Sequence, residues 1–113
     1  MKIEDLIPTP KDKVLFTRAS FKSVPKQEGC YVLVTYDNSI LYIGLSENIN
    51  SRFQQHLDNP EKTNPTKEGK AIWFYFITYD PNNLPQLERS WMNQYSALHG
   101  KRPILNKVDS PVS

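Results

Sequence analysis

The sequence predicts a small α+β domain in which a three-stranded antiparallel sheet is flanked by helices. Within residues 29–56, a polar break separates two apolar runs, and apolar residues then recur at every fourth position. This pattern indicates a β-hairpin followed by a helix. Residues 71–79 are almost entirely aromatic or β-branched and predict a central strand covered on both faces. Residues 84–98 repeat apolar side chains at helical spacing, which predicts a second helix.

The length and composition favour one soluble domain. With 113 residues, of which 38% are hydrophobic, the chain can bury a single core. No apolar run approaches the roughly 18 residues of a membrane helix, and residues 1–13 lack the apolar core of a secretory signal. We therefore expect a soluble, cytoplasmic protein with no membrane partner. The net charge of +2 is too small to indicate a nucleic-acid partner by itself.

The chain divides into a leader, a domain and a tail. Residues 1–28 contain three prolines and little periodicity, so we expect a leader that packs on the core. Its apolar group, Val14, Leu15, Phe16 and Phe21, would pack a turn of helix there. Residues 29–107 form the domain, and residues 108–113 form a C-terminal tail.

The hairpin has a short polar turn. Residues 32–34 and 40–43 are its apolar strands, and Asp37-Asn38-Ser39 is the turn between them. Ser46 and Asn48 follow as candidate N-caps of the first helix.

The first helix places two polar side chains beside its apolar stripe. Ile49, Phe53 and Leu57 recur at every fourth position and form that stripe. Arg52 and His56 are four residues apart, so they project on the same side of the helix, at the flank of the stripe. A cation and an imidazole are therefore expected near the edge of the sheet.

The second half of the domain begins with a loop. Residues 58–70 combine prolines, a glycine and several charges, which predicts a surface loop. The aromatic strand follows and ends in a turn at residues 80–83. The second helix is expected to begin near Pro85 and to end at Gly100. Residues 102–106 then return to the core as a short extended segment.

Glu88 is the residue that the helical pattern explains least well. It lies within the apolar stripe of the second helix, next to Leu87 and Trp91. A buried carboxylate is costly unless it is paired or binds a metal. The pattern leaves open whether Glu88 is a metal ligand, a salt-bridge partner of Arg52 or a residue at the rim of the stripe.

Several of these residues together resemble the GIY-YIG nuclease family. The two tripeptides that name the family match Gly29-Cys30-Tyr31 and Tyr42-Ile43-Gly44. The resemblance continues, in order, with Arg52, His56, Glu88 and Asn106. It covers roughly residues 29–107, and the histidine one turn after the arginine is typical of one branch of the family. Cys30 stands where isoleucine is commoner, at a position expected to point into the core.

The resemblance implies metal-dependent hydrolysis of a nucleic-acid phosphodiester. Glu88 would be the sole protein ligand of Mg²⁺ or Mn²⁺, which suits a hard cation that keeps most of its water. Arg52 would lie against the scissile phosphate and stabilise its growing charge. Tyr31 would be the general base or would orient the attacking water. A tyrosine with the usual pKa of about 10 needs a lowered pKa or a proton relay for this role.

The remaining motif residues would complete this site. Tyr42 and His56 would be hydrogen-bonded around Tyr31, and the sequence does not decide whether Tyr31 or His56 finally holds the proton. Asn106 would orient the site through a hydrogen bond. Gly44 would let the backbone and the substrate come close together.

Substrate binding is expected to come mainly from phosphate contacts. The candidate side chains are Lys62, Lys67, Lys70, Arg89, Lys101 and Arg102. Each could equally be an ordinary solvated residue. The sequence contains no reader module such as a helix-turn-helix, so we expect little sequence specificity. A protein partner or a homodimer would supply specificity or double-strand cleavage.

The sequence leaves more than one function open. The first is an endonuclease that nicks DNA. The second is a catalytically silent or partner-dependent nucleic-acid-binding subunit with the same fold, although a silent copy would be expected to have lost Glu88 or Arg52. A ribonuclease or a repair factor would use the same site, and a protein-interaction domain would use the aromatic strand. DNA versus RNA, the preferred nucleic-acid structure and the oligomeric state stay open.

Overall fold

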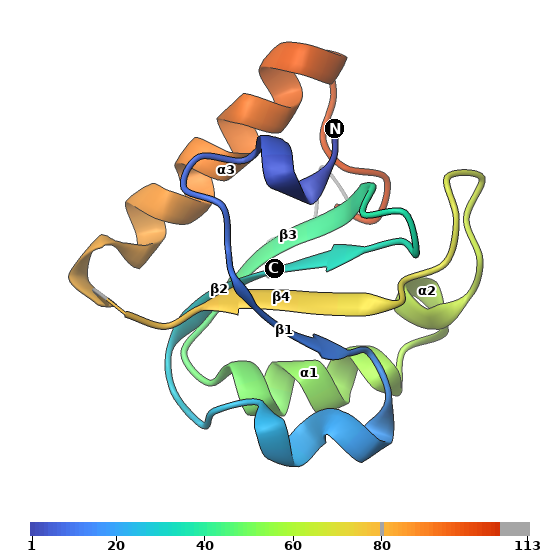
Figure 1. The fold of residues 1–113 in the computed structure, drawn as a ribbon, viewed down its shortest axis with the longest axis vertical. Helices are drawn as coiled ribbons and strands as arrows, with labels where there is room; N and C mark the ends of the chain where they lie inside the picture. The colour runs from blue at the N-terminus through green and yellow to red at the C-terminus, as the bar shows by residue number, and fades with distance from the viewer. Residues whose placement is uncertain (80, 107–113) are drawn as a thin grey trace.

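An antiparallel sheet between two helical layers organises the chain. The computed structural model describes residues 1–79 and 81–106, and within these residues the sheet has four strands in the order β1-β4-β2-β3 (Figure 1). The strands are β1 (Asp12–Leu15), β2 (Gly29–Val34), β3 (Ile40–Ser46) and β4 (Trp73–Ile77). The α-helices are α1 (Ile49–Leu57), α2 (Pro60–Thr63) and α3 (Leu84–His99). The 3₁₀ helices are η1 (Ile3–Asp5), η2 (Arg18–Ser23) and η3 (Pro81–Asn83).

The α+β fold is confirmed, but the described residues form four strands rather than the expected three. The additional strand, β1, comes from the segment that was expected to be a leader with a helical turn. It pairs antiparallel with β4, with Val14 opposite Phe74, and so satisfies backbone groups that β4 would otherwise expose at its edge. Its side chains are mostly exposed, so β1 lacks the alternation of apolar and polar residues by which a strand is recognised. Phe21 lies in η2.

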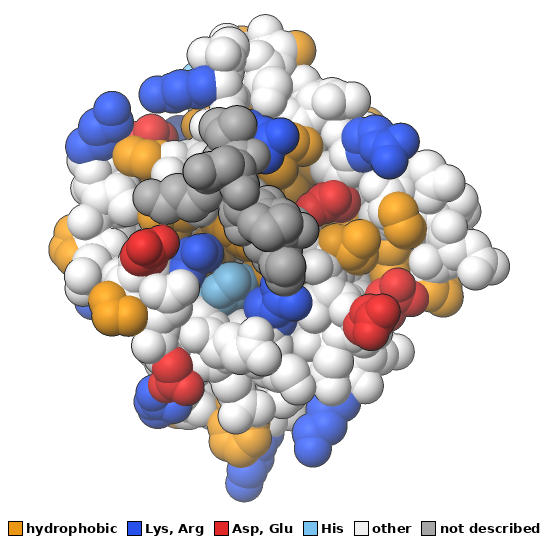
Figure 2. Space-filling model, turned by 180° about the vertical axis from the view of Figure 1, so that it is seen from behind, with side chains coloured by type: hydrophobic (Ala, Val, Ile, Leu, Met, Phe, Trp, Pro, Cys, Tyr) orange, Lys and Arg blue, Asp and Glu red, His pale blue; other side chains and the backbone are white. Residues whose placement is uncertain are grey.

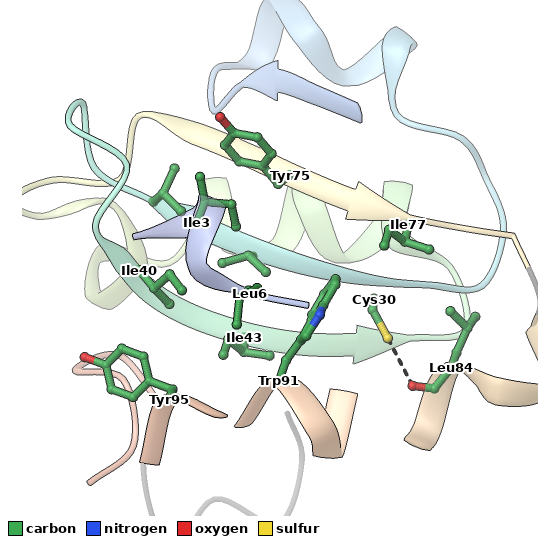
Figure 3. Packing of buried hydrophobic residues seen from close by; sticks show 12 residues of the cluster. Ile3, Leu6, Cys30, Ile40, Ile43, Tyr75, Ile77, Leu84, Trp91 and Tyr95 are labelled. Atoms are coloured by element: carbon green, nitrogen blue, oxygen red, sulfur yellow. Dashed lines mark hydrogen bonds between the residues drawn. The ribbon is translucent and has the colours of Figure 1, made fainter. Parts of the chain in front are cut away.

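The aromatic strand β4 is an interior strand, as predicted, with β1 on one side and β2 on the other. Apolar residues pack on both faces of the sheet. Figure 3 shows the cluster on the α3 face, where Trp91 packs in the core with Cys30 and Ile43. Cys30 therefore points away from the α1 face, and its Sγ donates a hydrogen bond to the carbonyl oxygen of Leu84 at 3.1 Å. Burial raises the pKa of the Cys30 thiol to about 12.

The register of the hairpin brings Tyr31 and Gly44 together. Leu33 pairs with Tyr42 and Val34 pairs with Ile40, so the ladder is irregular at this point. Beyond the irregularity, Tyr31 lies directly opposite Gly44. A Cβ atom on Gly44 would lie only 2.6 Å from the Tyr31 hydroxyl oxygen. The ring of Tyr31 therefore occupies the space that a side chain at position 44 would need.

The two long helices begin and end close to the predicted positions. Asn48 caps α1 by accepting a hydrogen bond from the backbone N–H of Ser51. The buried face of α1 contains Ile49, Phe53 and His56. This face packs on β2 and β3, whereas α3 covers the opposite face of the sheet (Figure 1).

The C-terminal end of α3 also follows the prediction. Gly100 ends the helix in the left-handed conformation, with φ 71°.

The segment between α1 and β4 is more ordered than predicted. It was expected to be a surface loop, but residues 60–63 form α2. Asn59 caps this helix by accepting a hydrogen bond from the N–H of Glu61, and Pro60 occupies its first turn. Of the predicted turn at residues 80–83, residues 81–83 form η3, and residue 80 lies outside the described residues.

The chain after α3 covers the free edge of β3. The backbone N–H of Leu105 donates to the carbonyl oxygen of Leu41. The Asn106 side chain accepts a hydrogen bond from the N–H of Ile43 and donates one to its carbonyl oxygen. The predicted tail, residues 108–113, lies outside the described residues. In the described part of the chain, no helix combines the length and the apolar character needed to cross a membrane.

Replacing Gly44 with alanine should destabilise the fold. The added methyl group would meet the Tyr31 ring, and overpacking of a core costs typically about 1–3 kcal/mol. Urea denaturation of the wild type and of Gly44→Ala measures this difference. In a Tyr31→Leu background the same substitution should cost less, because the shorter side chain leaves room for the methyl group. An equal cost in both backgrounds would show that the Tyr31 ring is not the obstacle.

Candidate active site

A cleft of about 620 Å³ lies beyond the β3 edge of the sheet, with walls from α1, α2, α3 and the segment after α3. It brings together many of the residues that the sequence singled out. Those that line it are Tyr42, Arg52, His56, Lys62, Glu88, Arg89, Arg102 and Asn106. Figure 2 shows a histidine side chain at the surface with Lys and Arg side chains on either side of it.

Tyr31 and His56 form a buried hydrogen-bonded pair at the base of this cleft. The Tyr31 hydroxyl oxygen lies 2.7 Å from His56 Nε2. Tyr31 is fully buried and His56 is 6% exposed. Tyr42 packs against both rings, with its centroid 5.9 Å from that of Tyr31 and 5.2 Å from that of His56. Phe74 stacks against Tyr31 at 5.1 Å and holds its ring in place.

The surroundings of this pair keep the proton on the tyrosine. Burial raises the pKa of Tyr31 well above its usual value, and Tyr42 raises it further, while Arg52 acts in the opposite direction. The pKa of His56 is lowered to about 3 by burial, and the positive charges of Lys62 and Arg52 lower it in the same sense. At neutral pH the imidazole is therefore uncharged and can accept a hydrogen bond from Tyr31. The lowered tyrosine pKa that would allow direct base chemistry is not found.

Arg52 and Glu88 reach the cleft from different helices. Arg52 is partly exposed on α1, and Glu88 is partly buried on α3. Burial raises the pKa of Glu88, while Arg89 and Arg102 lower it. Between the described residues Glu88 and Arg52 there is no ion pair within 4 Å. The salt bridge that the sequence left open is therefore not formed.

The acidic residues of the cleft restrict the kind of metal that it can hold. Among the described residues, no group of three or more His, Cys, Asp or Glu side chains is placed to bind a metal ion. Among the described residues that line the cleft, the acidic side chains are Glu61, which is exposed, and Glu88. A single carboxylate fits Mg²⁺ or Mn²⁺, because such hard cations keep several waters and take further oxygens from substrate phosphates. It does not fit zinc, which needs several protein ligands.

Gly44 and Asn106 support the β3 wall of the cleft. Gly44 is buried beneath the Tyr31 ring and leaves the space that this ring needs. It is not among the described residues that line the cleft. Asn106 bonds both backbone groups of Ile43, the residue next to Tyr42. These bonds fix the strand that carries Tyr42.

Some of the predicted substrate contacts do not reach the cleft. Lys67, Lys70 and Lys101 are exposed and are not among the described residues that line it.

Several further residues that line the cleft were not predicted from the sequence. These are Gln55, Asn59, Glu61, Met92, Asn93 and Leu105. Helical spacing could have identified part of this set, because Met92 and Asn93 lie one turn after Glu88 and Arg89. The Asn-Pro pair at residues 59–60 could have indicated α2.

Lowering the pH should destabilise the fold through His56. The pKa of His56 is about 3 in the folded chain, whereas an unfolded histidine titrates at about 6.5. The unfolded state therefore binds more protons between these values, and the free energy of unfolding falls as the pH falls through this window. The contribution from His56 should be about 2 kcal/mol lower at pH 5 than at pH 7.

Urea denaturation of the wild type and of His56→Gln at both pH values measures this contribution. The other titrating groups are common to both chains, so the variant should lose only the part that depends on His56. The same pH dependence in both chains would contradict the low pKa of His56.

Comparison with known proteins places these residues in a family. The sequence profile of the GIY-YIG catalytic domain matches residues 27–102. The chain is 32% identical over 80 residues to UvrABC system protein C of Mycoplasma genitalium, a match to 69% of this chain and 13% of that protein. It is 33% identical over 48 residues to UvrABC system protein C of Prochlorococcus marinus, which covers 42% of this chain and 7% of that protein.

The matches thus span a small part of each relative, while the family profile covers most of the present chain. The matched range contains both tripeptides of the hairpin, Arg52, His56 and Glu88, and Asn106 lies outside it. The chain belongs to the GIY-YIG family and carries the catalytic domain of these endonucleases.

Proposed function

We propose that the chain is a divalent-metal-dependent endonuclease that nicks DNA with little sequence specificity. The observation that carries the proposal is the buried Tyr31–His56 pair, 2.7 Å apart, beside a cleft that presents Arg52 and Glu88. A proton acceptor, a phosphate-binding cation and a metal-binding carboxylate are the groups that phosphodiester hydrolysis requires.

The charge of the cleft supports an anionic substrate. Its basic side chains are Arg52, Lys62, Arg89 and Arg102. They outnumber its acidic side chains, Glu61 and Glu88, among the described lining residues. A phosphodiester is attracted to such a site, and phosphate contacts supply most of the affinity of a non-specific nucleic-acid complex. Lys67, Lys70 and Lys101 would contact the backbone of a longer substrate outside the cleft.

Tyr31 and His56 would act together as the base. The attacking water gives its proton to the Tyr31 oxygen as the Tyr31 hydroxyl proton passes to His56 Nε2. The negative phosphate that enters the cleft raises the pKa of His56, because a nearby opposite charge favours the imidazolium. Binding of the substrate would thus prepare His56 to accept the proton. Tyr42 packs against both rings and would hold them in line.

The other site residues would bind and orient the reacting groups. Arg52 would donate hydrogen bonds to the phosphate oxygens as their charge grows. Glu88 would hold Mg²⁺ or Mn²⁺, which when bound supplies charge stabilisation to the phosphate and the departing oxygen. Asn106 would keep β3 in register with the segment after α3. Gly44 would keep Tyr31 close to the cleft.

Specificity would come from outside the cleft. The sequence contains no reader motif such as a helix-turn-helix. A protein partner or a second copy of the chain would select the substrate, and a second copy would convert nicking into double-strand cleavage. The relatives are named as proteins of the UvrABC system, and the match to a small part of each is consistent with a catalytic unit that works with additional modules.

Replacing Glu88 with alanine should abolish cleavage. Supercoiled plasmid is incubated with the protein in Mg²⁺, in Mn²⁺ and in EDTA, and open circles are measured on a gel. The wild type should form open circles in either metal and none in EDTA. The variant should form none although it still folds, and its thermal stability should be equal to that of the wild type or higher, since burial disfavours the charged form of Glu88 and the residue makes no ion pair with Arg52.

Glu47→Ala is the matched control, because Glu47 is exposed and lies outside the described cleft. Cleavage by Glu88→Ala at the wild-type rate would refute the metal assignment. Binding of DNA without cleavage by the wild type would instead favour a silent or partner-dependent subunit.

Replacing Arg52 with alanine should slow the reaction about 10²- to 10³-fold in kcat, by analogy with the loss of one oxyanion-hole donor. Arg52→Lys should recover part of the rate, since a lysine keeps the charge but not the two-pronged geometry. Initial rates on a fluorescent DNA duplex measure kcat and KM.

Arg18→Ala is the control for loss of a surface arginine. Arg18 pairs with Asp58 on the exposed surface, and such pairs contribute little to stability. Turnover by Arg52→Ala at the wild-type rate would remove Arg52 from the mechanism.

A further inference from the structure

Lys62 is an unusually buried lysine. It is 9% exposed, whereas lysine side chains are rarely this buried in folded proteins. The short helix α2 holds it there. Asn59 anchors this helix to the end of α1, because its N–H donates to the carbonyl oxygen of His56 and its own carbonyl oxygen accepts from the N–H of Lys62. The lysine is thus tied through the backbone to the residue that carries the imidazole.

The Lys62 ammonium is connected to Tyr31 through a series of ring contacts. Lys62 Nζ lies 4.9 Å from the centroid of the Tyr42 ring, within the range of a cation–π interaction. The edge-on contact between Tyr42 and His56 has a centroid distance of 5.2 Å. The His56 ring in turn meets the Tyr31 hydroxyl through its Nε2. Each contact lies in the cleft or directly beneath it.

The charged and titratable groups around His56 come from several elements. Tyr31 on β2 and Tyr42 on β3 contact its ring. Lys62 on α2 and Arg52 on α1 oppose a positive charge on it. Glu88 on α3 shares the cleft and would act in the opposite direction. One of the cations that act on His56, Lys62, is therefore not a motif residue of the family.

We propose that Lys62 is a positioning residue of this active site, which fixes the Tyr42 ring against His56 and so holds His56 Nε2 in place to accept the Tyr31 proton. This role rests on the proposed function and deepens it. Lys62 adds to the positive charge of the cleft, but its effect on the rate of the reaction passes through Tyr42 and His56. It differs in this respect from a lysine that only attracts phosphate, which would change substrate affinity alone.

Kinetics of Lys62 variants separate the two roles. Lys62→Met keeps the length of the side chain and removes its charge, and Lys62→Arg keeps the charge. For a positioning residue we expect kcat of Lys62→Met to fall about 10-fold or more, since a positioned acid or base contributes typically about 10²- to 10⁴-fold. Its KM should stay close to the wild-type value, and Lys62→Arg should recover most of kcat. A raised KM with unchanged kcat would overturn the proposal.

A matched lysine and a double variant complete the kinetic test. Lys26→Met should behave as the wild type, because Lys26 is exposed and is not among the described residues that line the cleft. In a His56→Gln background, Lys62→Met should have little further effect on kcat, because the His56 imidazole through which Lys62 acts is already absent. Independent, multiplicative losses would show that Lys62 does not act through His56.

Nuclear magnetic resonance gives a readout that needs no activity. The sequence has two histidines, His56 and His99, and His56→Gln identifies the signal of His56. Protonation of His56 should begin at a higher pH in Lys62→Met than in the wild type. The same onset in both chains would overturn the proposal. If the wild type cleaves no nucleic acid, the proposed function fails, and this titration alone decides whether Lys62 controls His56.

Discussion

The pairing of Tyr31 with Gly44 is the constraint on which the candidate site depends. Because position 44 has no side chain, the Tyr31 ring can lie across β3 and its hydroxyl can reach His56 Nε2 at 2.7 Å. The irregularity in the β2–β3 ladder determines which residues of the two strands lie opposite each other beyond it, and it places Tyr31 opposite Gly44. A shift by one residue would move Tyr31 to the opposite face, where α3 packs. The glycine of the second family tripeptide is thus explained by packing.

The site separates its charged groups from its proton acceptor. The hydrogen-bonded pair is buried beneath the cleft, where burial and nearby cations hold the imidazole uncharged. The cations and Glu88 line the open part, where a phosphate can enter. An anion that binds there would raise the pKa of His56 more strongly than the same charge would in water, because the site is partly desolvated. Binding and proton transfer would in this way be coupled.

Much of the fold and of the site could be predicted from the sequence. The hairpin, the aromatic interior strand and the two long helices follow from local apolar patterns and from caps such as Asn48 and Gly100. The sequence did not predict β1, because an edge strand with exposed side chains has no clear pattern. It missed α2 because a helix of one turn is too short for periodicity to reveal. Lys62 was therefore predicted to be a loop lysine, although it is a buried neighbour of Tyr42.

The sequence by itself determined the family and the order of the motif residues, because these depend on residue identity and spacing along one chain. Only the tertiary structure decided which side chains share the cleft, because Tyr42, His56 and Glu88 come from different elements. It also decided that Lys67, Lys70 and Lys101 remain outside the described cleft while Lys62 lies within it. Burial and neighbouring charge then set the pKa values of Tyr31 and His56, and both depend on packing between segments far apart in the sequence.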